Sequence, residues 1–203
     1  MSSYAVVTGG GTAGHVLPAL AVAEALVAAG HERSTVHFVG TARGVESRLL
    51  PPTGFPHTLL DISGLPRGLR PRDLWNTARL PWRAWRALRA ARRLLRELRP
   101  QVVVNFGGYG SFPATWAARR LGIPYVVVSY DRRPGLVSKL LAPRATVCAV
   151  AFAGSSLPHA EHTGAPVRGE LVRLDRGAAR EAARAELGLP ADRFVVAVVC
   201  GSL

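Results

Sequence analysis

The sequence contains little lysine and little cysteine. Lys139 is the one lysine among 26 basic residues, and Cys148 and Cys200 are the two cysteines in 203 residues. Both cysteines lie in apolar stretches, and neither they nor the six histidines have the spacing of metal ligands. A disulfide scaffold and a zinc site are therefore not expected, and no metal or other cofactor is implied. We expect the protein in a reducing cytoplasmic compartment.

Long apolar runs are also lacking. Charges or prolines interrupt every candidate before the roughly 18 residues that span a bilayer, as Glu24 does within residues 16–30. The first residues lead directly into an apolar strand, without the basic start and longer apolar core of a signal peptide. We therefore expect a protein that neither crosses a membrane nor is exported.

Acidic residues are few, with 13 against 26 basic ones and a net charge of +13. The hydrophobic share of 48% is enough for a core, which excludes an intrinsically disordered tail. The basic excess is uneven, because residues 67–99 hold eleven arginines and two acids. A strongly basic segment of this kind favours contact with an anionic partner.

Short β-branched runs alternate with helical patterns along most of the chain. Strands are predicted at residues 4–8, 35–40, 57–61, 101–105, 125–129 and 146–150, and helices at 16–29, 45–50, 82–98, after Ser111 and at 136–141. The alternation predicts an α/β fold, a doubly wound, mostly parallel Rossmann-like sheet with helices on both faces. Ligands of such sheets bind at the carboxyl ends of the strands.

Turn residues cluster after residue 150, and a new pattern follows them. We predict a first domain at residues 1–163, and a linker with the first helix and strand of a second domain at residues 164–203. The helix is expected at 176–187 and a fully apolar strand at 194–199. Such a strand needs burial on both faces of a sheet, so the second domain is expected to be incomplete here or completed by a separate donor-domain subunit.

Glycine-rich loops follow two of the predicted strands. Residues 9–14 open the first helix, where backbone N–H groups and the positive helix end can face a phosphate. The loop lacks a Walker lysine, and it lacks the acid that usually follows the second strand of a dinucleotide site, although Arg43 keeps an NADP-dependent oxidoreductase as an alternative. Residues 107–111 form the second loop, and the pair could hold a diphosphate; glycines that serve tight packing are the alternative.

His15 directly follows the first loop. The positive end of a helix lowers the pKa of a histidine placed there and favours the neutral imidazole, which can act as a general base. Spacing alone favours a histidine that serves packing or hydrogen bonding.

Several segments together resemble a known family. The run 9–23, the segment 38–41 with Glu46, and the segments 62–65, 107–109, 122–124 and 164–168 are similar, in order, to the MurG-type UDP-N-acetylglucosamine transferases, which are family 28 glycosyltransferases of GT-B fold. The resemblance implies that the N-terminal domain of the chain binds an undecaprenyl-diphosphate-linked sugar acceptor. It also implies that a C-terminal domain binds the UDP-sugar donor. It implies inverting transfer of N-acetylglucosamine, the lipid I to lipid II step of peptidoglycan synthesis.

The resemblance also assigns roles to individual residues. They are His15 as the base; Thr12, Ala13 and Gly14 in the loop that faces the reaction centre; Gly10, Gly11, Gly107, Gly108 and Tyr109 at the acceptor diphosphate; and Asp131, Arg168 and Ser202 at the donor. Where the family has His-Glu-Gln-Asn, this chain has Val128-Ser129-Tyr130-Asp131. A different lipid-linked or natural-product acceptor is therefore one alternative, and a noncatalytic module that binds membranes or lipid diphosphates is another.

Tryptophan and arginine share the basic segment. Trp75, Trp82, Trp85, Arg89 and Arg92 are the expected membrane contacts, because tryptophan favours the headgroup layer and arginine attracts anionic lipids. A helix with a solvated arginine-rich face is the alternative. No nucleic-acid-binding motif is present, so nucleic acid is not an expected partner. A peripheral position on the inner face of the cell membrane follows.

Overall fold

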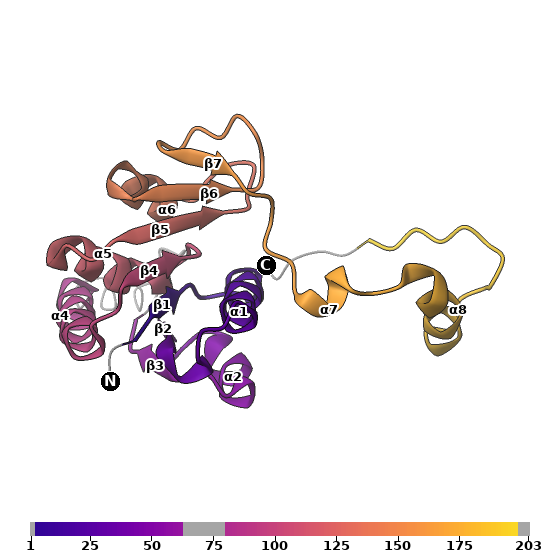
Figure 1. The fold of residues 1–203 in the computed structure, drawn as a ribbon, viewed down its shortest axis with the longest axis horizontal. Helices are drawn as coiled ribbons and strands as arrows, with labels where there is room; N and C mark the ends of the chain where they lie inside the picture. Colours follow the sequence, from indigo (N-terminus) through magenta and orange to yellow (C-terminus); the bar gives the residue numbers. More distant parts are fainter. Residues whose placement is uncertain (1–2, 63–79, 199–203) are drawn as a thin grey trace, which may run out of the picture.

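Seven parallel strands form one sheet in the computed structural model, which describes residues 3–62 and 80–198 (Figure 1). The strand order is β3-β2-β1-β4-β5-β6-β7. Their bounds are β1 Ala5–Thr8, β2 Val36–Thr41, β3 His57–Leu60, β4 Val102–Asn105, β5 Tyr125–Ser129, β6 Val147–Val150 and β7 Ala160–His162. The order reverses between β1 and β4, which makes their carboxyl ends the switch point of a doubly wound sheet.

Helices connect the strands and cover both faces of the sheet (Figure 1). Their bounds are α1 Ala13–Ala28, α2 Glu46–Leu49, α4 Leu80–Leu98, α5 Phe112–Leu121, α6 Leu136–Leu141, α7 Gly169–Val172 and α8 Arg176–Glu186. The predicted Rossmann-like α/β fold is thereby confirmed, with most predicted bounds within one to three residues of the observed ones.

Two hydrophobic clusters fill the space between the sheet and its helices. Successive residues of one strand serve opposite faces, so that Val6 packs in the cluster under α4 and α5, and Val7 packs in the cluster under α1. Small side chains such as Ala91 and Ala118 let α4 and α5 pack closely. Burial on both faces explains why the strands are apolar throughout rather than alternating.

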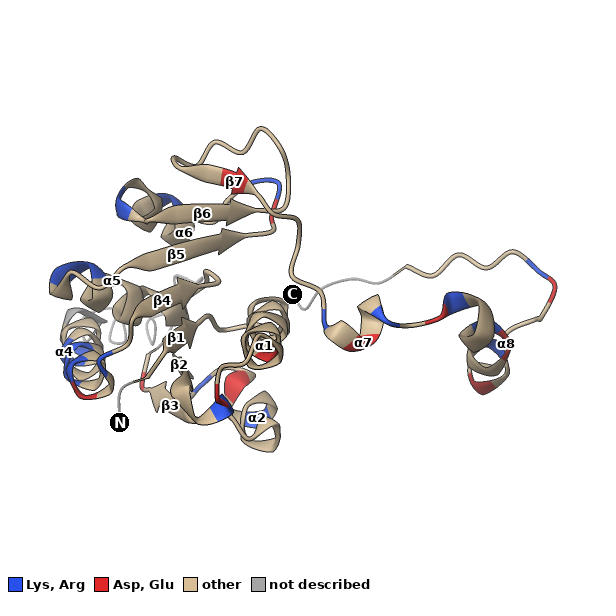
Figure 2. Cartoon of the chain, viewed as in Figure 1, with Lys and Arg blue, Asp and Glu red and all other residues tan. Residues whose placement is uncertain are grey.

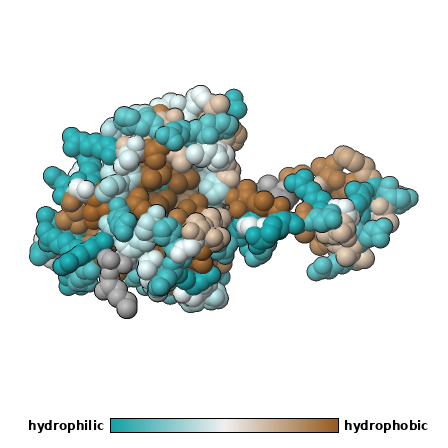
Figure 3. Space-filling view, viewed as in Figure 1, coloured by the Kyte–Doolittle hydropathy of each residue, from teal (hydrophilic) through white to brown (hydrophobic). Residues whose placement is uncertain are grey.

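The end of the described chain differs from the prediction. Residues 194–198 form no strand, and Phe194, Val196 and Val198 are 92%, 71% and 82% exposed. The prediction of a strand at 194–199 is wrong for the described part, because a strand requires a neighbouring strand and none of those described pairs with it. Figure 3 shows hydrophobic surface on the arm that residues 164–198 form beyond the sheet.

Two short elements were not predicted. The strand β7 pairs in parallel with β6, with Cys148 opposite Ala160, and α7 contacts α1. Both lie in the turn-rich stretch after residue 150, and three or four residues are too short to show a periodicity. The sheet therefore extends to His162, close to the predicted boundary after residue 163.

Candidate active site

The two glycine loops leave the sheet side by side. Loop 1 (residues 9–14) follows β1, and loop 2 (residues 107–111) follows β4. Thr8 at the end of β1 is paired with Asn105 at the end of β4. Loops separated by about a hundred residues in the chain thus meet at the switch point, as the sequence predicted for a shared ligand.

Contact between the loops depends on glycine. A Cβ on Gly108 would lie 2.2 Å from the carbonyl oxygen of Gly10, and a Cβ on Gly11 would lie 2.7 Å from the Tyr109 ring. Both glycines also have positive φ angles, +77° and +98°. Any larger residue would push the loops apart, so tight packing accounts for these two glycines whatever ligand the loops bind.

Some backbone amides of the second loop are used within the chain. The Gly107 amide donates to the Asn105 side-chain oxygen at 2.5 Å. The amides of Gly108 and Tyr109 have no acceptor among the described residues. These two N–H groups, beside the amino end of α5, are therefore able to donate to an anion.

His15 lies in the first turn of α1, after Thr12 in the N-cap position. Its Nδ1 pairs with the Thr12 hydroxyl at 2.9 Å. A Cβ on Gly107 would lie 3.6 Å from its Nε2, so this nitrogen faces loop 2. The threonine side chain thus orients the histidine instead of capping the helix.

Burial lowers the pKa of His15 below 6.5, and the charges of Asp131 and Glu46 oppose this by raising it. The direction of the pKa shift is the one that the sequence predicted, but its cause is burial and not the helix end. The imidazole is neutral near pH 7, as a general base requires.

A pocket of about 320 Å³ opens beside His15 at the carboxyl ends of β4 and β5. Its lining comes from α1, loop 2, β5 and the residues after it, and α6. The lining includes His15, Gly107, Gly108, Ser129, Tyr130, Asp131 and Ser138. The structure therefore brings His15 and the two glycines together with Asp131, which was predicted to contact the UDP-sugar donor.

Tyr130 forms one wall of this pocket. Its ring is tilted against that of His15, with centroids 6.3 Å apart, and its hydroxyl donates to the Phe106 carbonyl oxygen at 3.4 Å. Burial raises the pKa of this phenol, so it remains a neutral donor. Tyr130 and Ser138 were not among the predicted site residues; their positions just after β5 and in the following helix are the signal that could have identified them.

The other predicted site residues that the structure describes do not line this pocket. Thr12, Ala13 and Gly14 form the start of α1 beside the pocket, whereas Arg168 precedes α7 and does not line it. Ser202 and Trp75 lie outside the described residues. In the part of the chain that is described, no group of three or more histidines, cysteines or acids could hold a metal ion.

The geometry argues against a dinucleotide site. The Gly11 amide, which would face a pyrophosphate, donates to Glu46 Oε1 at 3.0 Å. Arg43, the candidate for a 2′-phosphate, is paired through Nε with Asp61 at 3.0 Å on the surface. The chain's own carboxylates thus occupy both groups that the oxidoreductase alternative needs.

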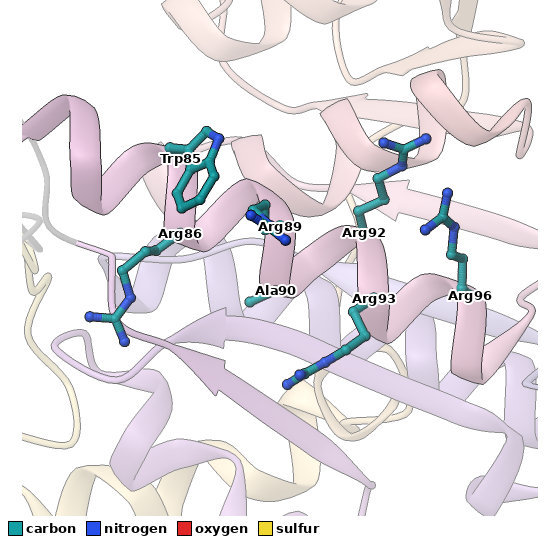
Figure 4. A pocket seen from close by; sticks show the side chains of 7 residues that line it. All are labelled: Trp85, Arg86, Arg89, Ala90, Arg92, Arg93 and Arg96. Atoms are coloured by element: carbon teal, nitrogen blue, oxygen red, sulfur yellow. The ribbon is translucent and has the colours of Figure 1, made fainter.

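Arginine and tryptophan side chains gather on the outer face of α4, where Figure 2 shows basic residues concentrated. Trp82 and Trp85 are 60% and 45% exposed and stack on each other, and Arg89 lies over the Trp85 ring at 4.5 Å. An open groove of about 710 Å³ is lined by Trp85, Arg86, Arg89, Ala90, Arg92, Arg93 and Arg96 (Figure 4).

The same surface continues onto α5. A second groove, of about 450 Å³, lies between the helices and is lined by Trp116 and Arg120 as well as by residues of α4. The sequence analysis missed Trp116, although the neighbouring Arg119 and Arg120 repeat the composition of α4. We call the exposed tryptophans and arginines of α4 and α5 the basic aromatic surface. No described helix is long and apolar enough to cross a membrane.

A doubly wound sheet with two glycine loops and a half-buried histidine at its switch point defines a Rossmann-like domain suited to a phosphorylated ligand. The family model described as the glycosyltransferase family 28 N-terminal domain matches residues 5–150. The chain therefore belongs to glycosyltransferase family 28.

Relatives and solved structures agree with this family. The chain is 46% identical over 198 residues to the UDP-N-acetylglucosamine–N-acetylmuramyl-(pentapeptide) pyrophosphoryl-undecaprenol N-acetylglucosamine transferase of Clavibacter sepedonicus, covering 97% of this chain and 53% of that protein. It is 44% identical to the protein of the same name from Leifsonia xyli, covering 100% and 55%. The chain thus spans about half the length of these curated relatives.

The solved structure of Acinetobacter baumannii MurG is 29% identical, with a TM-score of 0.67 over 81% of this chain and 46% of that one. A UDP-N-acetylglucosamine 2-epimerase from Rickettsia bellii, 14% identical with a TM-score of 0.58 over 94% of this chain and 52% of its own, shares the fold.

Proposed function

We propose that this chain is the acceptor half of a transferase that moves N-acetylglucosamine from UDP-GlcNAc to an undecaprenyl-diphosphate-linked sugar. The observation that carries the proposal is the position of His15, half-buried and with a lowered pKa, in a pocket that loop 2 and the carboxyl end of β5 line beside the switch point. The names of the relatives supply the substrates.

In this proposal His15 activates the acceptor. Its Nε2 accepts the proton of the sugar hydroxyl while Thr12 holds Nδ1. The hydroxyl oxygen forms a bond to the anomeric carbon of the donor sugar, the bond from that carbon to the UDP oxygen breaks, and the configuration inverts. The unbonded amides of Gly108 and Tyr109 donate to the acceptor diphosphate. Arg168 and Ser202 remain proposed donor contacts.

The pocket also supports a narrower hypothesis about the acceptor. Asp131 lies on its rim with Tyr130 beside it, in place of the uncharged pair that the family pattern has. A carboxylate there favours an acceptor that offers a hydroxyl or an ammonium group and disfavours an additional anion. A related lipid-linked acceptor is therefore the second candidate substrate.

A transfer assay tests the proposed activity. The chain is fused to the C-terminal half of the Leifsonia xyli relative and supplied with radiolabelled UDP-GlcNAc and lipid-linked muramyl-pentapeptide; the chain alone and the C-terminal half alone are the controls. Labelled lipid from the fusion and from neither control supports the proposal. A folded fusion that binds the acceptor and transfers nothing would contradict it and favour a noncatalytic lipid-binding module.

The basic aromatic surface is proposed to hold the protein at an anionic membrane, where a lipid-linked acceptor resides. Exposed tryptophans beside a concentration of arginines fit the headgroup region of such a membrane. A peripheral position on the inner face of the cell membrane is part of the same proposal.

A further inference from the structure

Glu46 is a buried carboxylate that the proposed mechanism does not use. It begins α2 and is 1% exposed, among the largest fully buried side chains. No lysine or arginine of the described residues forms an ion pair with it. Burial of a carboxylate is costly unless hydrogen bonds compensate it, so its hydrogen bonds indicate what it does.

One oxygen of Glu46 joins loop 1 to the sheet. Oε1 accepts a hydrogen bond from the Gly11 amide at 3.0 Å and another from the Thr41 amide at 3.1 Å. Gly11 lies in the middle of loop 1, and Thr41 is the last residue of β2. Charge-assisted bonds to backbone N–H groups are among the stronger hydrogen bonds in proteins. The carboxylate therefore fixes the loop against a rigid strand.

Two glycines next to this carboxylate leave it space that a side chain would fill. A Cβ on Gly10 would lie 1.9 Å from Oε1, and a Cβ on Gly44 would lie 2.0 Å from Oε2. Both positions thus require glycine while Glu46 is in place. The carboxylate thus takes the Gly11 amide, which could otherwise donate to an anionic ligand.

Fixing loop 1 also fixes loop 2 and His15. The carbonyl of Gly10 abuts Gly108, and the ring of Tyr109 lies on Gly11, so a shift of loop 1 displaces both contacts. His15 lies four residues after Gly11, in the first turn of α1, so the position of loop 1 also determines the position of His15.

The second carboxylate oxygen has no hydrogen-bond partner among the described residues. A group that served packing alone would not leave a buried polar atom unpaired, since this costs free energy. The charge itself has an effect, because Glu46 is one of the two acids that raise the pKa of His15.

We infer that Glu46 is a positioning residue: its carboxylate sets the distance between the two glycine loops and holds His15 in place beside the pocket. The inference rests on the proposed function for its consequence in transfer, but its structural part stands on the chain alone.

Three variants test the inference. Glu46→Ala removes both hydrogen bonds, and Glu46→Gln keeps one acceptor oxygen but removes the charge. Glu24→Gln is the matched control, because Glu24 is an exposed acid on α1, the same helix as His15, and is not among the charges that act on His15. Circular dichroism establishes that each variant folds.

Two measurements use the 203-residue chain without any substrate. NMR hydrogen exchange should show the Gly11 and Thr41 amides exchanging at least about tenfold faster in Glu46→Ala. NMR titration of the His15 ring should show a lower pKa in Glu46→Gln and an unchanged one in Glu24→Gln. Unchanged protection in folded Glu46→Ala, or an unchanged His15 pKa in Glu46→Gln, would overturn the inference; if Glu46→Ala does not fold, the Glu46→Gln titration decides.

The fused transferase supplies a third measurement. Displacement of the loops should lower kcat of Glu46→Ala about 100-fold. KM for UDP-GlcNAc should not change, because the proposal places the donor in the other half, and Glu46→Gln should lose less than Glu46→Ala. A normal kcat in Glu46→Ala would contradict the inference. Failure of the unmutated fusion to transfer would instead contradict the proposed function, and the NMR results would still decide the role of Glu46.

Discussion

His15 is subject to opposing influences. Burial lowers the pKa of its imidazole, whereas the charges of Asp131 and Glu46 raise it. The balance keeps the ring neutral near pH 7 yet allows it to accept a proton that the nearby acids then stabilise. His15 lines a pocket and has two acids that act on its charge, and these surroundings favour the base over the packing alternative.

Replacement of His15 should abolish transfer without unfolding the protein. Loss of a general base costs about 10²-fold to 10⁴-fold in rate, so we expect a decrease of that size for His15→Ala in the fused enzyme. His162→Ala, an exposed histidine on β7, is the control and should retain full activity. Near-normal turnover in His15→Ala, measured with radiolabelled donor, would remove His15 from the mechanism.

The pH dependence of transfer provides a separate test. The base acts in its neutral form, and its pKa lies below 6.5. The rate should therefore fall on the acidic side only below pH 6.5, at a lower pH than an unperturbed histidine would give. A profile of kcat against pH that declines above that value on its acidic side would be inconsistent with a buried, neutral His15.

His37 should make stability depend on pH. Burial, with a smaller contribution from His57, lowers its pKa below 6.5, so the unfolded chain binds the proton more readily than the folded one. Stability should be unaffected above pH 6.5 and fall as the pH decreases below it. Urea unfolding at about pH 7.5 and about pH 5 should show a smaller difference for His37→Gln than for the unmutated chain. An equal difference would show that His37 titrates normally.

Among the elements, α4 separates two functions by face. Ala87, Ala91 and Leu95 are buried against the sheet and α5, while the tryptophans and arginines face outward. Because the apolar face is already used for the core, the exposed tryptophans require another explanation than folding. Membrane binding supplies one.

Substitution of Trp82, Trp85 and Arg89 by alanine should weaken binding to anionic vesicles. An arginine near such a surface contributes about 1 kcal/mol, so with the two tryptophans we expect at least about a tenfold loss in partitioning. The control is Arg176→Ala with Arg180→Ala, which removes exposed positive charge from α8 instead. Vesicle sedimentation that shows equal partitioning for all variants would favour a merely solvated arginine face.

Element prediction succeeded where local pattern decides structure. The strand at residues 125–129 and the helix at 136–141 agree with the prediction to the residue, because each has its own periodicity and turn residues. The strand β7 and the residues 194–198 were misjudged in opposite directions. In both cases the outcome depends on a partner strand elsewhere in the chain. The strand β7 has such a partner in β6, whereas residues 194–198 have none among the described strands.

At the scale of the whole molecule, the sheet and the arm after it differ in packing. The sheet ends with β7, while α8 has no buried residue and α7 contacts α1 (Figure 1). Little apolar surface therefore ties residues 164–198 to the sheet, and the boundary after residue 163 stays a prediction.

Truncation after residue 163 should leave a folded unit. We expect cooperative unfolding with a Tm within a few degrees of the longer chain, because the removed elements bury little surface. Truncation after residue 150 is the control and should lower Tm clearly, since it removes β7 and its pairing with β6. Loss of cooperative unfolding in the chain of residues 1–163 would place the boundary elsewhere.

The sequence by itself determined the fold class, the two glycine loops and the candidate base, because hydrophobic periodicity and glycine spacing are local properties of the chain. Only the tertiary structure established the direct contact between these two loops, since the pairing of β1 with β4 brings distant segments together. It also decided that Asp131 lines the same pocket as His15 and that Glu46 binds the Gly11 amide of loop 1. Burial and hydrogen bonding between distant residues depend on the order of the strands, which no local pattern encodes.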